Sequence, residues 1–242
     1  MDDTRENASM TLEAFLWLAN KCISIDPGRP ALASAFRLGS YGVATDGRIA
    51  LIKEMTADEM CAGLLPRADG TQTEVGEVLI DRTIPQLAGE IARGIYGKYE
   101  IKVCKMQAVA AAIVADMAPH IAREDSRDWY EDSTRVIMPN AARTYISGYY
   151  GMILADLLPA GGPFEAFAHK HDSDMPLLFK GERWHCILMP LRTRSIFTMT
   201  GPSEYRKTSI ADAASGALVA RFMEDRPALQ ALRFPEKEGV QA

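Results

Sequence analysis

The feature that most constrains the fold of this chain is a pattern that occurs twice, an amphipathic helix followed by three short strands. In the first copy, Thr11 is placed to cap a helix, and apolar residues then recur at helical spacing as far as Ile23. Residues 26–28, Asp-Pro-Gly, end this helix. The three strands predicted after it span 31–38, 41–45 and 48–53. The Asp46-Gly47 pair between the last two strands indicates a hairpin.

The second copy lies in the last third of the chain. A short amphipathic helix is predicted over 150–158, where Pro159 and the pair Gly161-Gly162 end it. The three strands predicted after it span 164–169, 177–180 and 184–191. A repeated helix-and-strands unit favours the α+β class, with helices on one face of antiparallel sheets.

Between the two copies the pattern is less regular. Residues 56–76 are polar and interrupted by glycine and proline, which is typical of a loop or an insertion. The regular segments predicted in this part are strands at 78–80, 99–103, 134–138 and 144–147, and helices at 86–92 and 106–117. Residues 120–134 are dense in charge, and we interpret them as an exposed loop or a solvated helix extension.

Composition narrows the class of protein. The chain has 242 residues, 48% of them hydrophobic and 24% charged, as in an ordinary globular protein. Its net charge of −5 disfavours a protein that coats nucleic acid, although a local basic face stays possible. Four cysteines are scattered without a C-x-x-C pair, which predicts reduced thiols. The charged N-terminus and the short apolar run at 108–115 predict a cytoplasmic protein that does not bind membranes.

Two segments resemble motifs of a known family. Residues 43–52 read Val-Ala-Thr-Asp-Gly-Arg-Ile-Ala-Leu-Ile, and residues 187–192 read Ile-Leu-Met-Pro-Leu-Arg. In their order and in their spacing from the two helices they resemble the bacterial sliding clamp, the beta subunit of DNA polymerase III. In that family an A-T-D-G segment follows the first helix of a domain, and the chain closes with a strand ending in M-P-x-R. The likeness covers about residues 11–55 and 143–193.

The resemblance implies the sliding-clamp (DNA clamp) fold, in which sheets lie outside and helices face the DNA. The clamp-like region would span 8–194 as one enlarged or two reduced clamp domains, followed by a helical or flexible C-terminal appendage over 195–242. The family's two motifs line an apolar groove that receives short linear peptides of polymerases and repair proteins. The groove residues implied here are Thr45, Gly47, Arg48 and Ile49 on one side, and Leu188, Met189, Pro190, Leu191 and Arg192 on the other.

The function implied is therefore that of a non-enzymatic processivity factor or docking platform for DNA polymerase and other replication or repair proteins. Such a protein would belong to a phage, plasmid or bacterial replication system and needs no cofactor and no metal. In the family the two motifs lie in different domains of a three-domain chain. This chain is too short for three domains, so the sequence leaves open whether the two motifs share one groove.

Double-stranded DNA is the weaker of the predicted partners. A helix that faces DNA needs Lys and Arg, because neutralising phosphates supplies most of the non-specific affinity. The two predicted helices offer only Lys21 against Glu13 and Asp156. The residues considered as DNA-facing are Lys21, Lys98, Lys102 and Lys105. A ring would also require a homo-oligomer, so a clamp-fold regulator that does not bind DNA is an open alternative.

A metal-dependent hydrolase or nuclease is the alternative from another class. His169 and His171 are two residues apart at the end of a predicted strand, so their side chains would point the same way. The carboxylates of Asp172 and Asp174 follow, and imidazole and carboxylate groups are common metal ligands. His185 could join them from a neighbouring strand. The same residues are also typical of a polar hairpin loop.

Overall fold

The computed structural model describes residues 9–24, 28–101, 135–137 and 144–190. These residues form an α+β fold around a seven-stranded antiparallel sheet, so the predicted α+β class is confirmed. From one edge to the other, the strands of this sheet are β1 (Phe36–Leu38), β2 (Tyr41–Thr45), β3 (Ile49–Glu54), β9 (Trp184–Leu188), β8 (Leu177–Gly181), β7 (Phe164–His169) and β4 (Tyr96–Tyr99). A separate two-stranded antiparallel sheet contains β5 (Arg135–Ile137) and β6 (Tyr145–Ser147).

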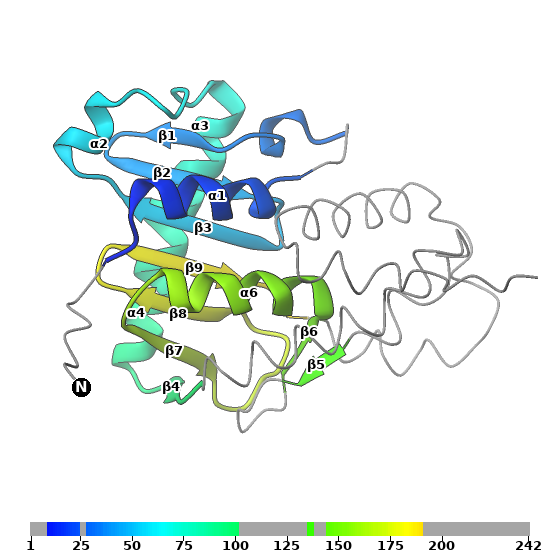
Figure 1. Cartoon of the computed structure of the whole chain (residues 1–242). Helices are drawn as coiled ribbons and strands as arrows, with labels where there is room; N and C mark the ends of the chain where they lie inside the picture. The colour runs from blue at the N-terminus through cyan, green and yellow to red at the C-terminus, as the bar shows by residue number, and fades with distance from the viewer. Residues whose placement is uncertain (1–8, 25–27, 102–134, 138–143, 191–242) are drawn as a thin grey trace, which may run out of the picture.

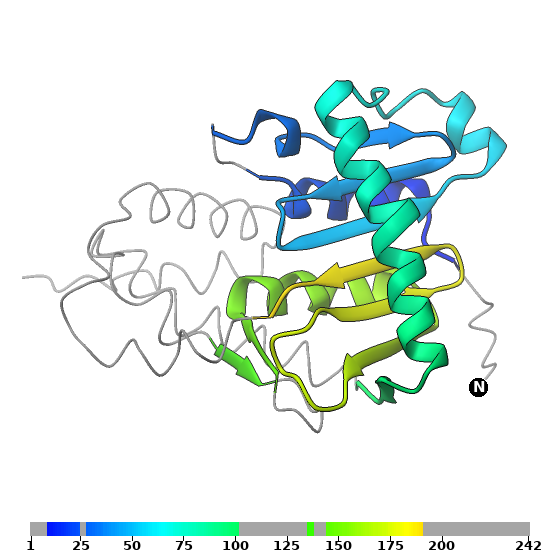
Figure 2. The ribbon, with the colours of Figure 1, turned by 180° about the vertical axis from the view of Figure 1, so that it is seen from behind.

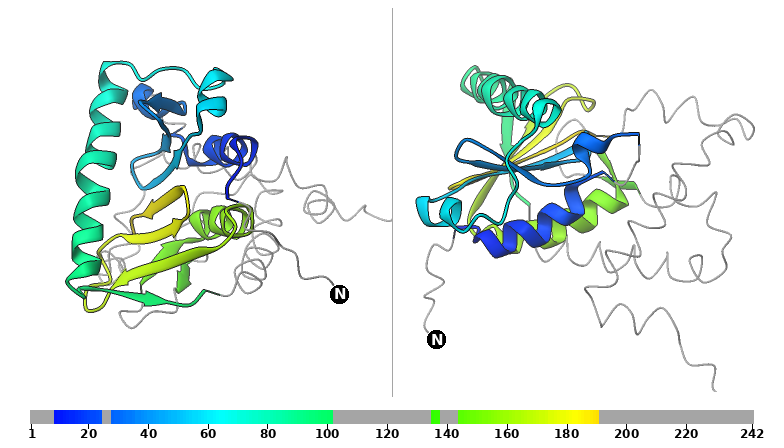
Figure 3. Two further views of the ribbon diagram at one scale, coloured as in Figure 1. Left: turned by 90° about the vertical axis from the view of Figure 1, so that its left-hand side faces the viewer. Right: turned by 90° about the horizontal axis from the view of Figure 1, so that it is seen from above.

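Helices lie on both faces of the large sheet (Figures 1 and 2). Helices α1 (Leu12–Cys22) and α6 (Gly148–Ala160) pack against each other on one face, as the view from above in Figure 3 shows. The other face carries one long helical segment made of three consecutive elements: α3 (Gly70–Glu77), the π-helix η2 (Val78–Thr83) and α4 (Ile84–Ala92). Two shorter helices are η1 (Pro30–Leu32) and α2 (Ala57–Cys61).

The predicted duplication is present in the structure. The unit α1-β1-β2-β3 recurs as α6-β7-β8-β9, and the third strands of the two units pair antiparallel at the centre of the sheet. In this pairing Ile49 lies opposite Leu188 and Lys53 lies opposite Trp184. Because the two units meet through equivalent strands and place their helices on one face, they are arranged as if related by a two-fold axis.

Helix α1 forms for the reasons visible in its sequence. The Thr11 hydroxyl oxygen accepts a hydrogen bond from the Ala14 N–H at 3.1 Å and so satisfies one of the free donors of the first turn. Phe15 and Leu18 are fully buried against the sheet, one turn apart. Cys22, one turn further on, is also fully buried.

Helix α6 is apolar on nearly all sides and correspondingly buried, which is unlike a helix that lies on a protein surface. It continues through Pro159 to Ala160, beyond the predicted end, because a proline in the last turn removes only one hydrogen bond. The helix ends at Gly161, whose N–H donates to the Leu157 carbonyl at 2.8 Å, and at Gly162, which has a φ of 72°.

Three sequence predictions are wrong in the middle of the chain. Residues 56–76 are a loop only over 62–69, because two capping boxes begin helices on either side, Thr56 with Glu59 and Asp69 with Gln72. The predicted strand at 78–80 is helical and lies inside η2. The expectation of helices on one face only also fails, because apolar residues of the long helical segment cover the second face.

Other segments agree more closely, or lie outside the described residues. Strand β7 has the predicted bounds, and strand β4 lies at 96–99 where 99–103 was predicted. Strands β5 and β6 lie within their predicted segments. The predicted helix at 106–117, the charged segment at 120–134 and the appendage at 195–242 lie outside the described residues.

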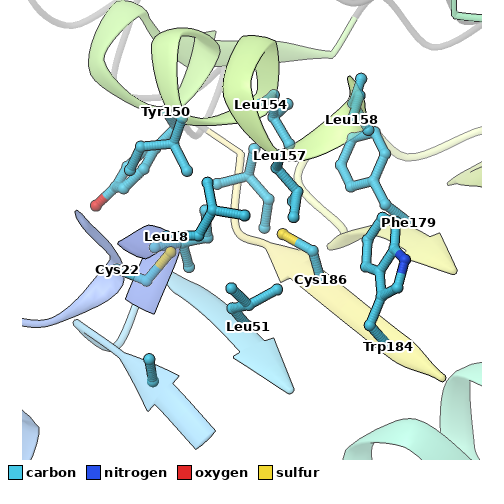
Figure 4. Packing of buried hydrophobic residues seen from close by; sticks show 14 of the residues in the cluster. Leu18, Cys22, Leu51, Tyr150, Leu154, Leu157, Leu158, Phe179, Trp184 and Cys186 are labelled. Atoms are coloured by element: carbon cyan, nitrogen blue, oxygen red, sulfur yellow. The ribbon is translucent and has the colours of Figure 1, made fainter. Parts of the chain in front are cut away.

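The sheet separates two hydrophobic clusters. The larger one lies between the sheet and the helices α1 and α6, and Figure 4 shows part of it, with Leu51 and Cys186 of the central strands facing α6. The smaller one lies under the long helical segment and contains Phe36 of β1 and Leu87 of α4. No helix in the described part of the chain is long and apolar enough to cross a membrane.

Candidate functional site

The Thr-Asp-Gly segment forms the tight turn between β2 and β3. The Thr45 hydroxyl donates to the Ile49 carbonyl at 2.7 Å and accepts from the Gly47 N–H at 3.0 Å, so it spans the turn. Gly47 has a φ of 90°, a left-handed conformation that glycine adopts without strain. The turn therefore contains a threonine, whose hydroxyl makes both hydrogen bonds, and a glycine, which tolerates the left-handed φ.

The carboxylate of Asp46 is the centre of the turn. Its Oδ1 atom accepts from the N–H groups of Arg48 at 2.7 Å and Ile49 at 2.9 Å. Its Oδ2 atom accepts from the Tyr150 hydroxyl at 2.7 Å, and Tyr150 comes from α6 of the other repeat unit. Figure 4 shows Tyr150 on α6 with its hydroxyl pointing away from the helix. The turn is therefore held by its own backbone and by the second unit at once.

The end of β9 lies beside this turn. Ile49, the first residue of β3, is paired with Leu188, the last residue of β9. One residue further, the Met189 N–H donates to the Arg48 carbonyl at 2.7 Å. The two sequence segments that carry the clamp resemblance are thus joined by hydrogen bonds at the centre of the sheet.

The described residues of the implied groove differ in exposure. Ile49 and Leu188 are 0% exposed and belong to the large hydrophobic cluster, so their side chains contribute to the core. Thr45 and Pro190 are also buried. The exposed ones are Gly47, Arg48 and Met189, of which Met189 is 38% exposed. Leu191 and Arg192 lie outside the described residues.

The thiols behind this turn are buried. Burial raises the pKa of Cys22, and the charges of Cys186 and Asp46 add to the effect. Burial likewise raises the pKa of Cys186. Both side chains therefore stay neutral and act as small apolar groups in the core.

Of the lysines considered as DNA-facing, the two that the structure describes do not form a basic surface. Lys21 is 2% exposed, and its ammonium group lies 3.4 Å from the Asp156 carboxylate and 3.8 Å from the ring centre of Trp17. Its charge is therefore neutralised between α1 and α6. Lys98 is exposed on β4 and pairs with Glu165 at 2.8 Å. Lys102 and Lys105 lie outside the described residues.

The histidine and aspartate residues of the metal alternative form a turn after β7. The Nδ1 atom of His169 accepts from the N–H groups of His171 at 3.2 Å and Asp172 at 2.9 Å. The Asp172 carboxylate accepts from the Asp174 N–H at 2.9 Å. Among the described residues, no three His, Cys, Asp or Glu side chains are grouped as metal ligands.

His185 is not beside this turn. It lies on β9, opposite Ile52 and Lys180, two strands away from β7. Burial lowers the pKa of His185, and the charge of Lys180 adds to the shift. The described geometry therefore gives the metal alternative no support.

Two parts of the site were not predicted from the sequence. The sequence places Tyr150 only in the predicted helix over 150–158, and Asp46 only in the hairpin turn and the Thr-Asp-Gly motif, without a role in the groove. The Arg29 guanidinium also contacts the turn, donating to the Asp46 carbonyl at 3.2 Å. A signal for Asp46 was present, because aspartate in turns commonly bonds to backbone N–H groups two residues on. No local signal links it to Tyr150, which follows 104 residues later.

Comparison with known proteins gives no further information about this site. No protein-family model, no curated protein and no solved structure matches the chain.

Proposed function

We propose that this chain is a clamp-like docking platform that binds a short linear peptide of a replication or repair protein where the Thr-Asp-Gly turn meets the end of β9. The observation that carries the proposal is the hydrogen bond from the Met189 N–H to the Arg48 carbonyl at 2.7 Å. It brings the two segments of the clamp resemblance to one surface, although they lie in opposite halves of the sequence.

The chemistry of this surface suits recognition of a partner chain. The turn is held rigid by Asp46 and Tyr150, so little conformational entropy is lost when a ligand binds. Beside it, the exposed thioether of Met189 adapts its shape to different apolar side chains. Arg48 adds an exposed positive charge that favours a partner with acidic residues.

The repeated units support a clamp-like architecture, with two differences from the family's arrangement. Helix pairing on one face of the sheet matches the expectation, but the long segment α3-η2-α4 covers the face that the family leaves outside. The paired helices also offer no exposed basic surface, since Lys21 is ion-paired and buried and α6 is apolar. The proposal is therefore a docking platform that does not use these helices to surround DNA.

Fluorescence anisotropy with a labelled peptide of the Gln-x-x-Leu-Phe type tests this proposal. We expect saturable binding by the full chain and at least a tenfold loss of affinity in Met189→Glu, because a charge replaces the apolar anchor. Leu64→Glu is the control, since Leu64 is 60% exposed in the loop between α2 and α3. Absence of peptide binding by the unmodified chain, or unchanged affinity in Met189→Glu, would disprove the platform.

A further inference from the structure

A surface hollow of about 400 Å³ lies at the β1 edge of the sheet, away from the turn described above. Two of its lining residues are Arg37, in the middle of β1, and Arg67, in the loop between α2 and α3. The hollow lies beside Gly39, at the end of β2 opposite to the Thr-Asp-Gly turn. Any ligand that it binds is therefore independent of the proposed peptide surface.

The backbone holds the two arginines next to each other. Arg37 and Arg67 form a parallel β-bridge, an arrangement that places paired side chains on the same side. Two hydrogen bonds fix it, from the Arg37 N–H to the Pro66 carbonyl at 2.7 Å and from the Ala68 N–H to the Arg37 carbonyl at 2.9 Å. The backbone positions of the two arginines are therefore fixed by hydrogen bonds between β1 and the neighbouring loop.

Side-chain alternation gives the direction of Arg37. Its neighbours Phe36 and Leu38 both pack into the cluster under the long helical segment. Since successive side chains of a strand point to opposite faces, the Arg37 side chain leaves the sheet on the other face. It is half-buried there, and Arg67 is exposed.

Neither arginine has an acidic partner among the residues that the structure describes. Some other cations of the described part do: Lys21 pairs with Asp156, Lys53 with Glu59, and Lys98 with Glu165. Two adjacent positive charges without a counter-ion repel each other, and this repulsion is relieved by an anion. Guanidinium groups bind phosphate oxygens through two parallel hydrogen bonds each.

We propose that the Arg37–Arg67 hollow binds a phosphate group carried as a monoester. At neutral pH a phosphate monoester has a charge of roughly −1.5 to −2, which matches two guanidinium groups. A phosphodiester of a nucleic acid backbone carries a single negative charge and matches the pair less well. The ligand is therefore a small phosphate monoester or a phosphorylated side chain of another protein.

Isothermal titration calorimetry with methyl phosphate and dimethyl phosphate tests the proposal on the full chain. We expect saturable binding of methyl phosphate and at least fivefold weaker binding of dimethyl phosphate. Arg37→Gln and Arg67→Gln should each lower the methyl phosphate affinity at least tenfold. Arg93→Gln, at an exposed arginine that ends α4, should change it less than twofold. Absence of saturable binding, or equal losses in Arg67→Gln and Arg93→Gln, would overturn the site.

Gly39 allows a second test with matched variants. It has a φ of 58°, and no heavy atom lies within 4 Å of an added Cβ, so asparagine and aspartate both fit this position at a similar backbone cost. Gly39→Asp should reduce methyl phosphate binding at least tenfold because its carboxylate competes for the arginines. Gly39→Asn should retain binding within twofold. Equal affinities of the two variants would contradict the proposal.

A short peptide containing phosphoserine separates the two sources of the ligand. If the peptide binds at least fivefold more tightly than methyl phosphate, and Arg67→Gln abolishes this gain, the phosphate belongs to a phosphorylated protein. If both bind equally, the ligand is a small phosphate monoester. Failure of both probes would refute the site, and it would leave the peptide surface at Met189 unaffected.

Discussion

The two repeat units end in equivalent hairpins that are stabilised in opposite ways. The β2–β3 hairpin depends on hydrogen bonds, with Asp46 binding two backbone N–H groups and the Tyr150 hydroxyl. The β8–β9 hairpin depends mainly on packing, because the indole of Trp184 is fully buried in the core. The indole N–H is satisfied there by donating to the Gly161 carbonyl at 2.8 Å. The first unit therefore presents a polar, exposed turn, whereas the turn of the second unit packs against an aromatic ring.

Glycines reflect this difference. A Cβ atom at Gly161 would lie 2.5 Å from the indole ring of Trp184, and the same ring also excludes a side chain at Gly181. At Gly47 an added Cβ would meet the flexible end of Arg29 at 3.1 Å and make an ordinary contact with Leu32 at 3.6 Å. The second hairpin is therefore closed around an aromatic ring, and the first is open on its outer side.

The largest effect should come from the second hairpin. Trp184→Ala should lower the free energy of unfolding by about 3 to 5 kcal/mol, because it leaves a large cavity and an unpaired Gly161 carbonyl. Urea denaturation followed by circular dichroism measures this change. Trp17→Ala is the control, and it should cost no more than about 1.5 kcal/mol because Trp17 is 37% exposed. Equal losses of unfolding free energy in the two variants would contradict the claim that the buried Trp184 stabilises the second hairpin.

A smaller effect is expected at the centre of the first hairpin. Asp46→Ala should cost about 2 kcal/mol in the free energy of unfolding, since two N–H groups lose a charged acceptor. Asp46→Asn should cost about half as much, because its amide oxygen still accepts from both groups. Chemical denaturation of the two variants measures the difference. Identical unfolding of Asp46→Ala and the unmodified chain would show that the turn is held by other contacts.

The link between the two units should be weaker still. Tyr150→Phe should cost about 1 kcal/mol, the usual value of a single hydrogen bond, as the phenyl ring retains its packing. A double-mutant cycle of Tyr150→Phe with Asp46→Ala measures their coupling free energy. We expect a clear favourable coupling, and a value near zero would mean that the second unit does not stabilise the turn.

The exposed tips of the two hairpins should contribute least. Arg48→Ala and Glu182→Ala, both at exposed positions, should each change the free energy of unfolding by less than about 0.5 kcal/mol, as is usual for surface substitutions. Differential scanning calorimetry checks both variants. Any effect of Arg48→Ala on peptide binding would then be due to a lost contact. Substantial destabilisation by Arg48→Ala would show that the Arg48 side chain helps to stabilise the turn.

Much of the repeated architecture could be predicted from the sequence, because its signals are local. The cap at Thr11, the Asp46-Gly47 turn and the glycines after α6 each specify an element boundary through neighbouring residues. The pairing of β3 with β9 depends on contacts between residues far apart in the sequence, and no local pattern specifies it. The same is true of Lys21, whose partner Asp156 lies 135 residues later.

The first part of the long helical segment, α3 and η2, was missed for a different reason, whereas the helix predicted over 86–92 is confirmed within α4. Its start at Asp69 carries a capping box with Gln72, a local signal that was present in the sequence. Its apolar stripe is irregular, since the π-helix η2 inserts a wider turn between Val75 and Ile84 and shifts the spacing from that of an α-helix. Glycine at position 76 further lowers its helical propensity, although the position is buried under Leu38 and Phe36, where a side chain would not fit.

Hydrogen exchange of backbone amides with and without the Gln-x-x-Leu-Phe peptide tests the central claim most directly. The account predicts slower exchange on peptide addition at the amides of Gly47, Arg48 and Met189, and no change in the hairpin at 181–184. Unchanged exchange around Gly47, or equal protection of both hairpins, would contradict the claim that the first turn and the end of β9 form the docking surface.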